Sequence, residues 1–186
     1  MQLSPRGKFL LLIGLFFVPV VAAYIAYLGW RPSAHGNYGE LLRVTPLQQT
    51  AGARPDGEAL DFTALRGKWL MVRVGGGACD PACAQQLYLT RQVRTAQGKD
   101  QSRIERVWVL TDGHAPDATL LQTHPGLIVW RPANPDFLAQ FPGAGREDSV
   151  YLVDPLGNLM LRFPAHPDPK RMMKDLKLLL KASQIG

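Results

Sequence analysis

The sequence has little cysteine, no internal repeat and no acidic residue near its start. Only two of its 186 residues are cysteines, so any thiol chemistry depends on a single pair. The absence of a repeat argues against a repeat architecture. An apolar segment occupies the start of the chain, and the remainder is about one domain's worth of residues. A second globular domain is therefore not expected.

Acidic residues are missing from the first 31 positions, where Arg6, Lys8 and Arg31 supply three of the six net positive charges. The other three match the basic excess of one segment, residues 168–181. Because the excess belongs to one helix, the sequence does not indicate a nucleic-acid surface, and no nucleic-acid partner is expected. We interpret the basic side as a solvated helix face rather than a membrane-binding one. The opposite side carries an apolar stripe, formed by Met172, Met173, Leu176, Leu179 and Leu180.

Residues 9–30 contain no charge and predict one transmembrane helix. A helix of that length, rising about 1.5 Å per residue, covers the roughly 30 Å hydrocarbon core of a bilayer. A cleaved signal peptide is the alternative, but the apolar run is long and ends in Tyr24, Tyr27 and Trp30, which favours an anchor. The basic side, residues 1–8, is expected in the cytoplasm. The chain is thus predicted to be a single-pass protein of a bacterial inner membrane with a periplasmic C-terminal domain.

The rest of the chain predicts an α/β domain at residues 45–186, after a linker at residues 31–44. Residues 31–58 are rich in proline, glycine and alanine and indicate a tether followed by a hairpin. Strands are expected at 68–74, 104–111, 127–130, 149–154 and 158–163, and helices or helical turns at 81–98, 117–123, 135–140 and 168–182. This order of elements is that of a thioredoxin-like fold, a central mixed sheet flanked by helices.

The two cysteines, Cys79 and Cys83, follow a predicted strand and three glycines. Asp80 is a good N-cap and Pro81 a good first helical residue, so Cys83 is placed in the first turn of a helix. A helix N-terminus stabilises thiolate, which is both a nucleophile and a soft metal ligand. The pair therefore suits thiol-disulfide exchange or Cu(I). A purely structural disulfide is the alternative, although closing so short a loop adds little stability.

Three stretches resemble the Sco/SenC proteins: 65–70 (LRGKWL), 75–83 (GGGACDPAC) and 150–157 (VYLVDPLG). The resemblance covers most of residues 45–182. It implies a role in assembling the copper centre of cytochrome c oxidase, as a copper chaperone, a thiol reductant or both. Cys79 and Cys83 would then occupy the positions of two copper ligands. By analogy with thioredoxins, Cys79 would attack a target disulfide and Cys83 would resolve the mixed disulfide.

The chain departs from this family at the third copper ligand. The family places a histidine just before the strand that is predicted near Ser149, and residues 143–149 contain none. His166, which follows the predicted hairpin, is kept as a candidate replacement, while His35, His114 and His124 are interpreted as ordinary loop histidines. Met71 and Met160 are expected in the core. Two thiolates alone can hold Cu(I), and exchange needs only the two sulfurs.

The sequence thus predicts a membrane-anchored Sco-like factor for cytochrome c oxidase biogenesis that uses Cys79 and Cys83 for thiol-disulfide exchange, Cu(I) handling or both. Its expected partners are an oxidase subunit or other periplasmic assembly factors. One alternative is a general periplasmic thiol-disulfide oxidoreductase without copper. Such proteins usually carry Trp-Cys-x-x-Cys, whereas Ala78 precedes Cys79 here. The other alternative is a non-catalytic assembly scaffold, which the missing histidine favours.

Overall fold

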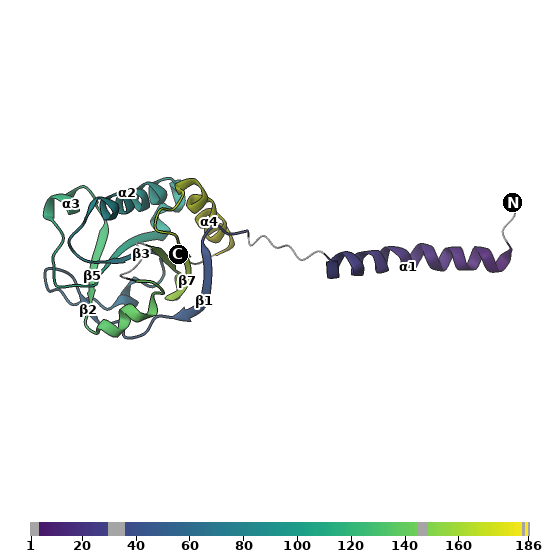
Figure 1. Ribbon diagram of the computed structural model, residues 1–186, viewed down its shortest axis with the longest axis horizontal. Coiled ribbons are helices and arrows are strands. Elements are labelled where there is room, and N and C mark those ends of the chain that lie inside the picture. The colour runs from purple at the N-terminus through teal and green to yellow at the C-terminus, as the bar shows by residue number, and fades with distance from the viewer. Residues whose placement is uncertain (1–3, 30–35, 145–148, 184, 186) are drawn as a thin grey trace. The chain divides into compact units, whose positions relative to one another are not determined.

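The computed structural model describes residues 4–29, 36–144, 149–183 and 185, and the chain divides into two units (Figure 1). The first unit, Met1–Gly36, contains the helix α1 (Pro5–Gly29). Its stretch Pro5–Leu28 is long and apolar enough to cross a membrane, judged by length and composition. The second unit, Asn37–Gly186, contains all the strands described and has its own core.

The second unit is built on a seven-stranded mixed sheet with the order β1-β7-β6-β3-β4-β5-β2. At its centre, β3 pairs in parallel with β4, which pairs in parallel with β5, whereas β3 pairs antiparallel with β6. The strand β7 continues the sheet antiparallel to β6, across the predicted hairpin. The bounds are β3 (Trp69–Gly75), β4 (Ile104–Leu110), β5 (Leu127–Pro132), β6 (Val150–Val153) and β7 (Asn158–Phe163).

The segment before the central strands contains the predicted hairpin turn, where Ala53 pairs antiparallel with Ala59 and the Arg54 amide donates to the Glu58 carbonyl oxygen at 2.8 Å. The same segment corrects another expectation. Strands β1 (Glu40–Pro46) and β2 (Gly52–Ala53) lie at opposite edges of the sheet. The first pairs antiparallel with β7 and the second antiparallel with β5. Thus β1 begins inside the stretch that we expected to be a linker. Its side chains are mostly exposed, so it lacks the alternation by which a strand is recognised in a sequence.

The helices α2 (Pro81–Thr95) and α4 (Pro169–Ala182) pack against one face of the sheet and contact each other (Figure 1). The short helix α3 (Ala118–Gln122) and three 3-10 turns, η1 (Phe62–Leu65), η2 (Gly98–Arg103) and η3 (Pro135–Gln140), complete the fold. Successive side chains of β3 point to opposite faces, so Val72 joins one core and Met71 the other. Met71 is thus in the core as predicted, and Met160 packs against the same cluster. The thioredoxin-like fold is confirmed.

Candidate functional site

The loop that leads to the cysteines lies tightly against the loop that follows β4. A Cβ atom on Gly76 would lie 2.6 Å from an oxygen of Asp112, and one on Gly77 would lie 2.1 Å from the His114 carbonyl oxygen. The Thr111 amide also donates to the Gly75 carbonyl at 3.2 Å. Glycine is needed at Gly77 because the His114 backbone leaves no room for a side chain, and at Gly76 the Asp112 carboxylate occupies the space.

The helix that carries Cys83 begins as the sequence predicts. The Asp80 side chain accepts a hydrogen bond of 2.8 Å from the Cys83 amide, and Pro81 occupies the first turn. Proline fits there because the first helical amides have no partner within the helix, and its fixed φ suits a helical residue. The carboxylate of Asp80 therefore lies beside the buried cysteine.

Cys79 and Cys83 form a disulfide, with 5.3 Å between their Cα atoms. They differ in exposure: Cys83 is 1% exposed, whereas Cys79 is only partly buried. Cys83 packs with Leu87, Trp108 and Leu110 on the α2 side of the sheet. An approaching thiolate or disulfide can thus reach Cys79 more easily than Cys83.

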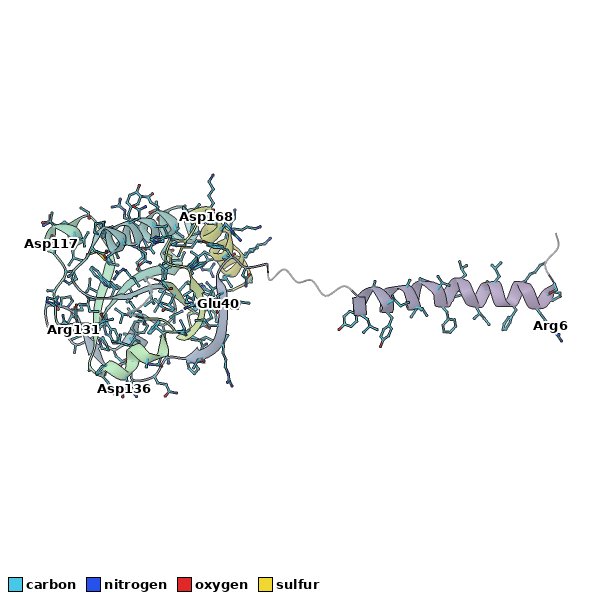
Figure 2. All side chains as sticks on the ribbon, viewed as in Figure 1. Arg6, Glu40, Asp117, Arg131, Asp136 and Asp168 are labelled. Atoms are coloured by element: carbon cyan, nitrogen blue, oxygen red, sulfur yellow. A yellow bond between two sulfur atoms is a disulfide. The ribbon has the colours of Figure 1, made fainter. Side chains whose placement is uncertain are left out.

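A polar group that the sequence analysis missed lies beside this loop. The Asp112 carboxylate accepts hydrogen bonds from the Gly77 amide at 2.9 Å and from the His114 amide at 3.1 Å. Its other oxygen lies 3.2 Å from Nδ1 of the exposed His114 ring. Arg131, labelled in Figure 2, donates to the carbonyl oxygens of Asp112 at 3.0 Å and of His114 at 3.2 Å.

The hydrogen bond from the Gly77 amide is the main reason why the pKa of Asp112 is lowered, with further contributions from His114. Asp112 is therefore a carboxylate that holds His114 next to the cysteine loop. The signal for this cluster was available in the sequence, because residues that follow two parallel neighbouring strands meet at the same edge of a sheet. The register pairs Gly75 with Leu110, which places residues 76–78 beside residues 111–114.

The other candidate ligands are placed differently. His166 is exposed in the connection between β7 and α4, and His124 is buried after α3. His35 and residues 145–148, where the family histidine was sought, lie outside the described residues, whereas Ser149 is buried. Within the described ranges, no three or more His, Cys, Asp or Glu side chains gather as a metal site.

Solved structures with the same fold include several Sco proteins. Copper-bound ScoI of Bradyrhizobium japonicum is 19% identical, with a TM-score of 0.54 over 74% of this chain and 99% of that chain. Apo Sco1 of Thermus thermophilus is also 19% identical, with a TM-score of 0.58 over 81% of this chain and 98% of that one. Copper-bound yeast Sco1 is 15% identical, with a TM-score of 0.56 over 79% and 90%. The predicted resemblance to Sco proteins is confirmed in the fold.

A comparison with curated proteins found no match. One family model does match, over residues 69–183, and it is described as a transmembrane-like, thioredoxin-like, C-terminal domain. The match extends from β3 to the end of α4 and so includes the cysteine pair, the Asp112 cluster and most of the sheet. Because it covers more than half of the chain, this protein belongs to the transmembrane-like, thioredoxin-like, C-terminal domain family.

Proposed function

We propose that this chain is a membrane-anchored, Sco-like factor for cytochrome c oxidase biogenesis, in which Cys79 and Cys83 perform thiol-disulfide exchange, handle Cu(I), or both. The observation that carries the proposal is the unequal exposure of two bonded cysteines at a helix start. A partly exposed cysteine and a buried cysteine suit a nucleophile and a resolving thiol. A purely structural link would not need the outer sulfur to remain accessible.

The exchange reaction uses the reduced pair. The Cys79 thiolate attacks a target disulfide, forms a mixed disulfide and releases one target thiolate, which takes up a proton. The Cys83 thiolate then attacks Cys79 Sγ, closes the bond found here and releases the second target thiolate. The target gains two electrons and this chain loses them. An external dithiol donor must reduce the pair again before another cycle.

Cu(I) would be a cargo for the same two sulfurs. Two thiolates can hold Cu(I) in a linear arrangement, and an imidazole nitrogen can add a third ligand. His166 remains a candidate from the sequence. The contact between the His114 backbone and Gly77 supports His114 as a second candidate, since the same loop carries the cysteines.

The anchor and its location belong to the same proposal. The length and apolar composition of α1, and the basic residues Arg6 and Lys8 before the apolar run, support one span in a bacterial inner membrane with the domain in the periplasm. An oxidising compartment would also form the Cys79–Cys83 disulfide readily. The expected partners are an oxidase subunit or another assembly factor.

A Cu(I) titration of the reduced domain, residues 37–186, against a competing chelator tests the copper half. This unit has its own sheet and core, so it can be studied alone. The same titration is made on four variants: Cys79→Ser, Cys83→Ser, His114→Ala and His166→Ala. One-to-one binding that needs both cysteines supports copper handling, and the histidine variant that weakens it identifies a third ligand.

A redox titration with glutathione buffers tests the exchange half. A pair that cycles between dithiol and disulfide and reduces an added protein disulfide supports exchange. If the domain neither binds Cu(I) above a free-thiol background nor exchanges disulfides, and oxidase assembly survives the double change to serine, the protein is a scaffold.

A further inference from the structure

Four lysines form one stripe along α4. Lys170, Lys174, Lys177 and Lys181 recur at intervals of three or four residues, so they lie on one side of the helix, and all four are exposed. The apolar residues Met172, Leu176 and Leu180 are buried on a different side, against the sheet. The sequence alone favoured a merely solvated face, but three features of the structure point to a partner.

The acidic side chains at the start of α4 and within it accept hydrogen bonds from backbone amides. Asp168, labelled in Figure 2, caps the helix by accepting from the Lys170 amide at 2.8 Å and the Arg171 amide at 3.3 Å. Asp175 is 3% exposed and does not lie on the surface at all. Among the ion pairs of the described residues, none includes a lysine of the stripe. The exposed side of α4 is therefore positive along its whole length.

The start of the domain is fixed to this same helix. The Asp175 carboxylate accepts hydrogen bonds of 2.8 Å from both the Tyr38 and the Gly39 amides. The Tyr38 hydroxyl accepts one of 2.9 Å from the Asp168 amide, and the Arg171 guanidinium lies 4.2 Å over the Tyr38 ring. A buried carboxylate with two amide partners is a strong restraint. The chain thus enters the domain at α4.

The length of chain between α1 and this contact is short. Tyr38 follows Gly29, the last residue of α1, by nine residues, and nine residues span at most about 30 Å when fully extended. A 14-residue helix such as α4 is itself about 21 Å long. If α1 spans a membrane, α4 cannot move far from the headgroups.

We propose that the lysine stripe of α4 docks on anionic phospholipid headgroups of the membrane that holds α1. The partner is a lipid surface because the short tether keeps such a surface at a high effective concentration, whereas an acidic protein would have to diffuse to the site. Lysines attract an anionic surface as point charges, without needing a shaped pocket. This inference rests on the anchor in the proposed function.

The docking is tested without the anchor, so that the two ideas can fail separately. The domain, residues 37–186, is sedimented with phosphatidylglycerol or phosphatidylcholine vesicles at low and high salt. We expect binding to phosphatidylglycerol only, weakened by salt. Replacing Lys170, Lys174, Lys177 and Lys181 by Gln should lower the affinity by about tenfold or more. A control with the same charge change replaces four exposed cations elsewhere by Gln: Arg43, Arg54, Arg66 and Lys99.

The control variant should bind like the unchanged domain. Equal binding to both lipids would overturn the proposal. Equal losses of affinity in the two variants would also overturn it, because they would show that the net charge of the domain, and not the lysine stripe, drives binding. Retained circular dichroism and unchanged urea midpoints show that both variants are folded.

The full chain in proteoliposomes provides a second test. Acetylation by a lysine-reactive ester is read by mass spectrometry, with Lys99 as the internal reference. The four lysines of the stripe should react more slowly in phosphatidylglycerol than in phosphatidylcholine, and Lys99 should not. Equal rates in both lipids would refute docking even if α1 is an anchor. Resistance of the full chain to carbonate extraction tests the anchor separately.

Discussion

Two helices on the same face of the sheet begin with the same dipeptide, and comparing them separates local from tertiary effects. Asp80-Pro81 opens α2 and Asp168-Pro169 opens α4, and each aspartate accepts hydrogen bonds from amides of the first turn. The Asp80 carboxylate bonds the Cys83 amide. The Asp168 carboxylate bonds amides of two exposed cations, Lys170 and Arg171.

The two helices thus begin with the same kind of local cap, an aspartate followed by a proline, whereas the residues around each cap differ. The start of α2 lies behind three glycines and carries a disulfide, whereas the start of α4 receives the incoming chain through Tyr38. The comparison also refines one expectation. Because Asp80 occupies the Cys83 amide and adds a negative charge, the helix start stabilises thiolate less than an uncapped one would.

Substitutions of the cysteines at the start of α2 should have the largest effects on the exchange reaction. Cys79→Ser should slow reduction of a protein disulfide by about a thousandfold or more, because the accessible nucleophile is lost. Cys83→Ser should still attack but accumulate a mixed disulfide, which mass spectrometry detects. Either change should cost no more than about 2 kcal/mol of unfolding free energy, since the loop is short. Unchanged exchange in Cys79→Ser would refute the assigned order of attack.

Substitutions at the contact between α4 and the entering chain should have the largest effects on the free energy of unfolding. Asp175→Ala leaves the part-buried Tyr38 amide and the buried Gly39 amide without their acceptor, so we expect a loss of about 2–4 kcal/mol in urea unfolding. Asp175→Asn keeps an acceptor oxygen and should lose less. A loss for Asp175→Ala below that of Asp168→Ala would show that the buried carboxylate does not hold the entering chain.

Two glycines in the adjoining loops allow a test of how much the close packing beside the cysteines contributes to stability. A Cβ on Gly77 would collide with the His114 carbonyl oxygen, whereas one on Gly113 meets nothing within 4 Å. Gly77→Ala should therefore destabilise the domain by about 1–3 kcal/mol and alter the exchange rate. Gly113→Ala, in the same pair of loops, should stay within about 0.5 kcal/mol of the unchanged protein. Equal urea midpoints would mean that the two loops separate easily.

Removing the two caps tests whether the starts of α2 and α4 are equivalent in stability and differ only in their effect on the cysteines. Asp80→Ala and Asp168→Ala should each cost about 1 kcal/mol, because each removes one N-cap. Only Asp80→Ala should lower the pH at which Cys79 of the reduced protein becomes reactive, since it removes a negative charge and frees the Cys83 amide. Iodoacetamide alkylation rates measured across pH show this. The same shift in Asp168→Ala would indicate a general effect of charge.

The contrast also shows what could be predicted from the sequence. Asp80-Pro81 was predicted as a helix start because a cap depends on a few adjacent residues. The strand β1 was missed because its partner β7 is more than 100 residues away and its own side chains are mostly exposed. Asp175 counted as one more helix charge, although it is buried against Tyr38. Each feature that the sequence did not predict depends on a contact between residues that are far apart in the sequence.

The smallest expected effect concerns His124, which lies near the α2 half of the sheet. It is 6% exposed, and the carbonyl oxygens of its neighbours Thr123 and Pro125 accept hydrogen bonds from Arg91 and Arg106. Burial, followed by repulsion from Arg106 and Arg91, lowers the pKa of His124. An unfolded histidine titrates near pH 6.5. The folded protein therefore binds this proton less readily than the unfolded chain.

The contribution of His124 to stability should thus be fully present above about pH 6.5 and be lost progressively as the pH falls below it. Urea unfolding of His124→Gln at pH 7.5 and pH 5 measures this contribution, and His166→Gln, at an exposed site, is the matched control. The slope with pH is the quantity to compare, because His124→Gln could also alter packing at both pH values. An identical slope in all three proteins would show that His124 takes up its proton in the folded state without penalty.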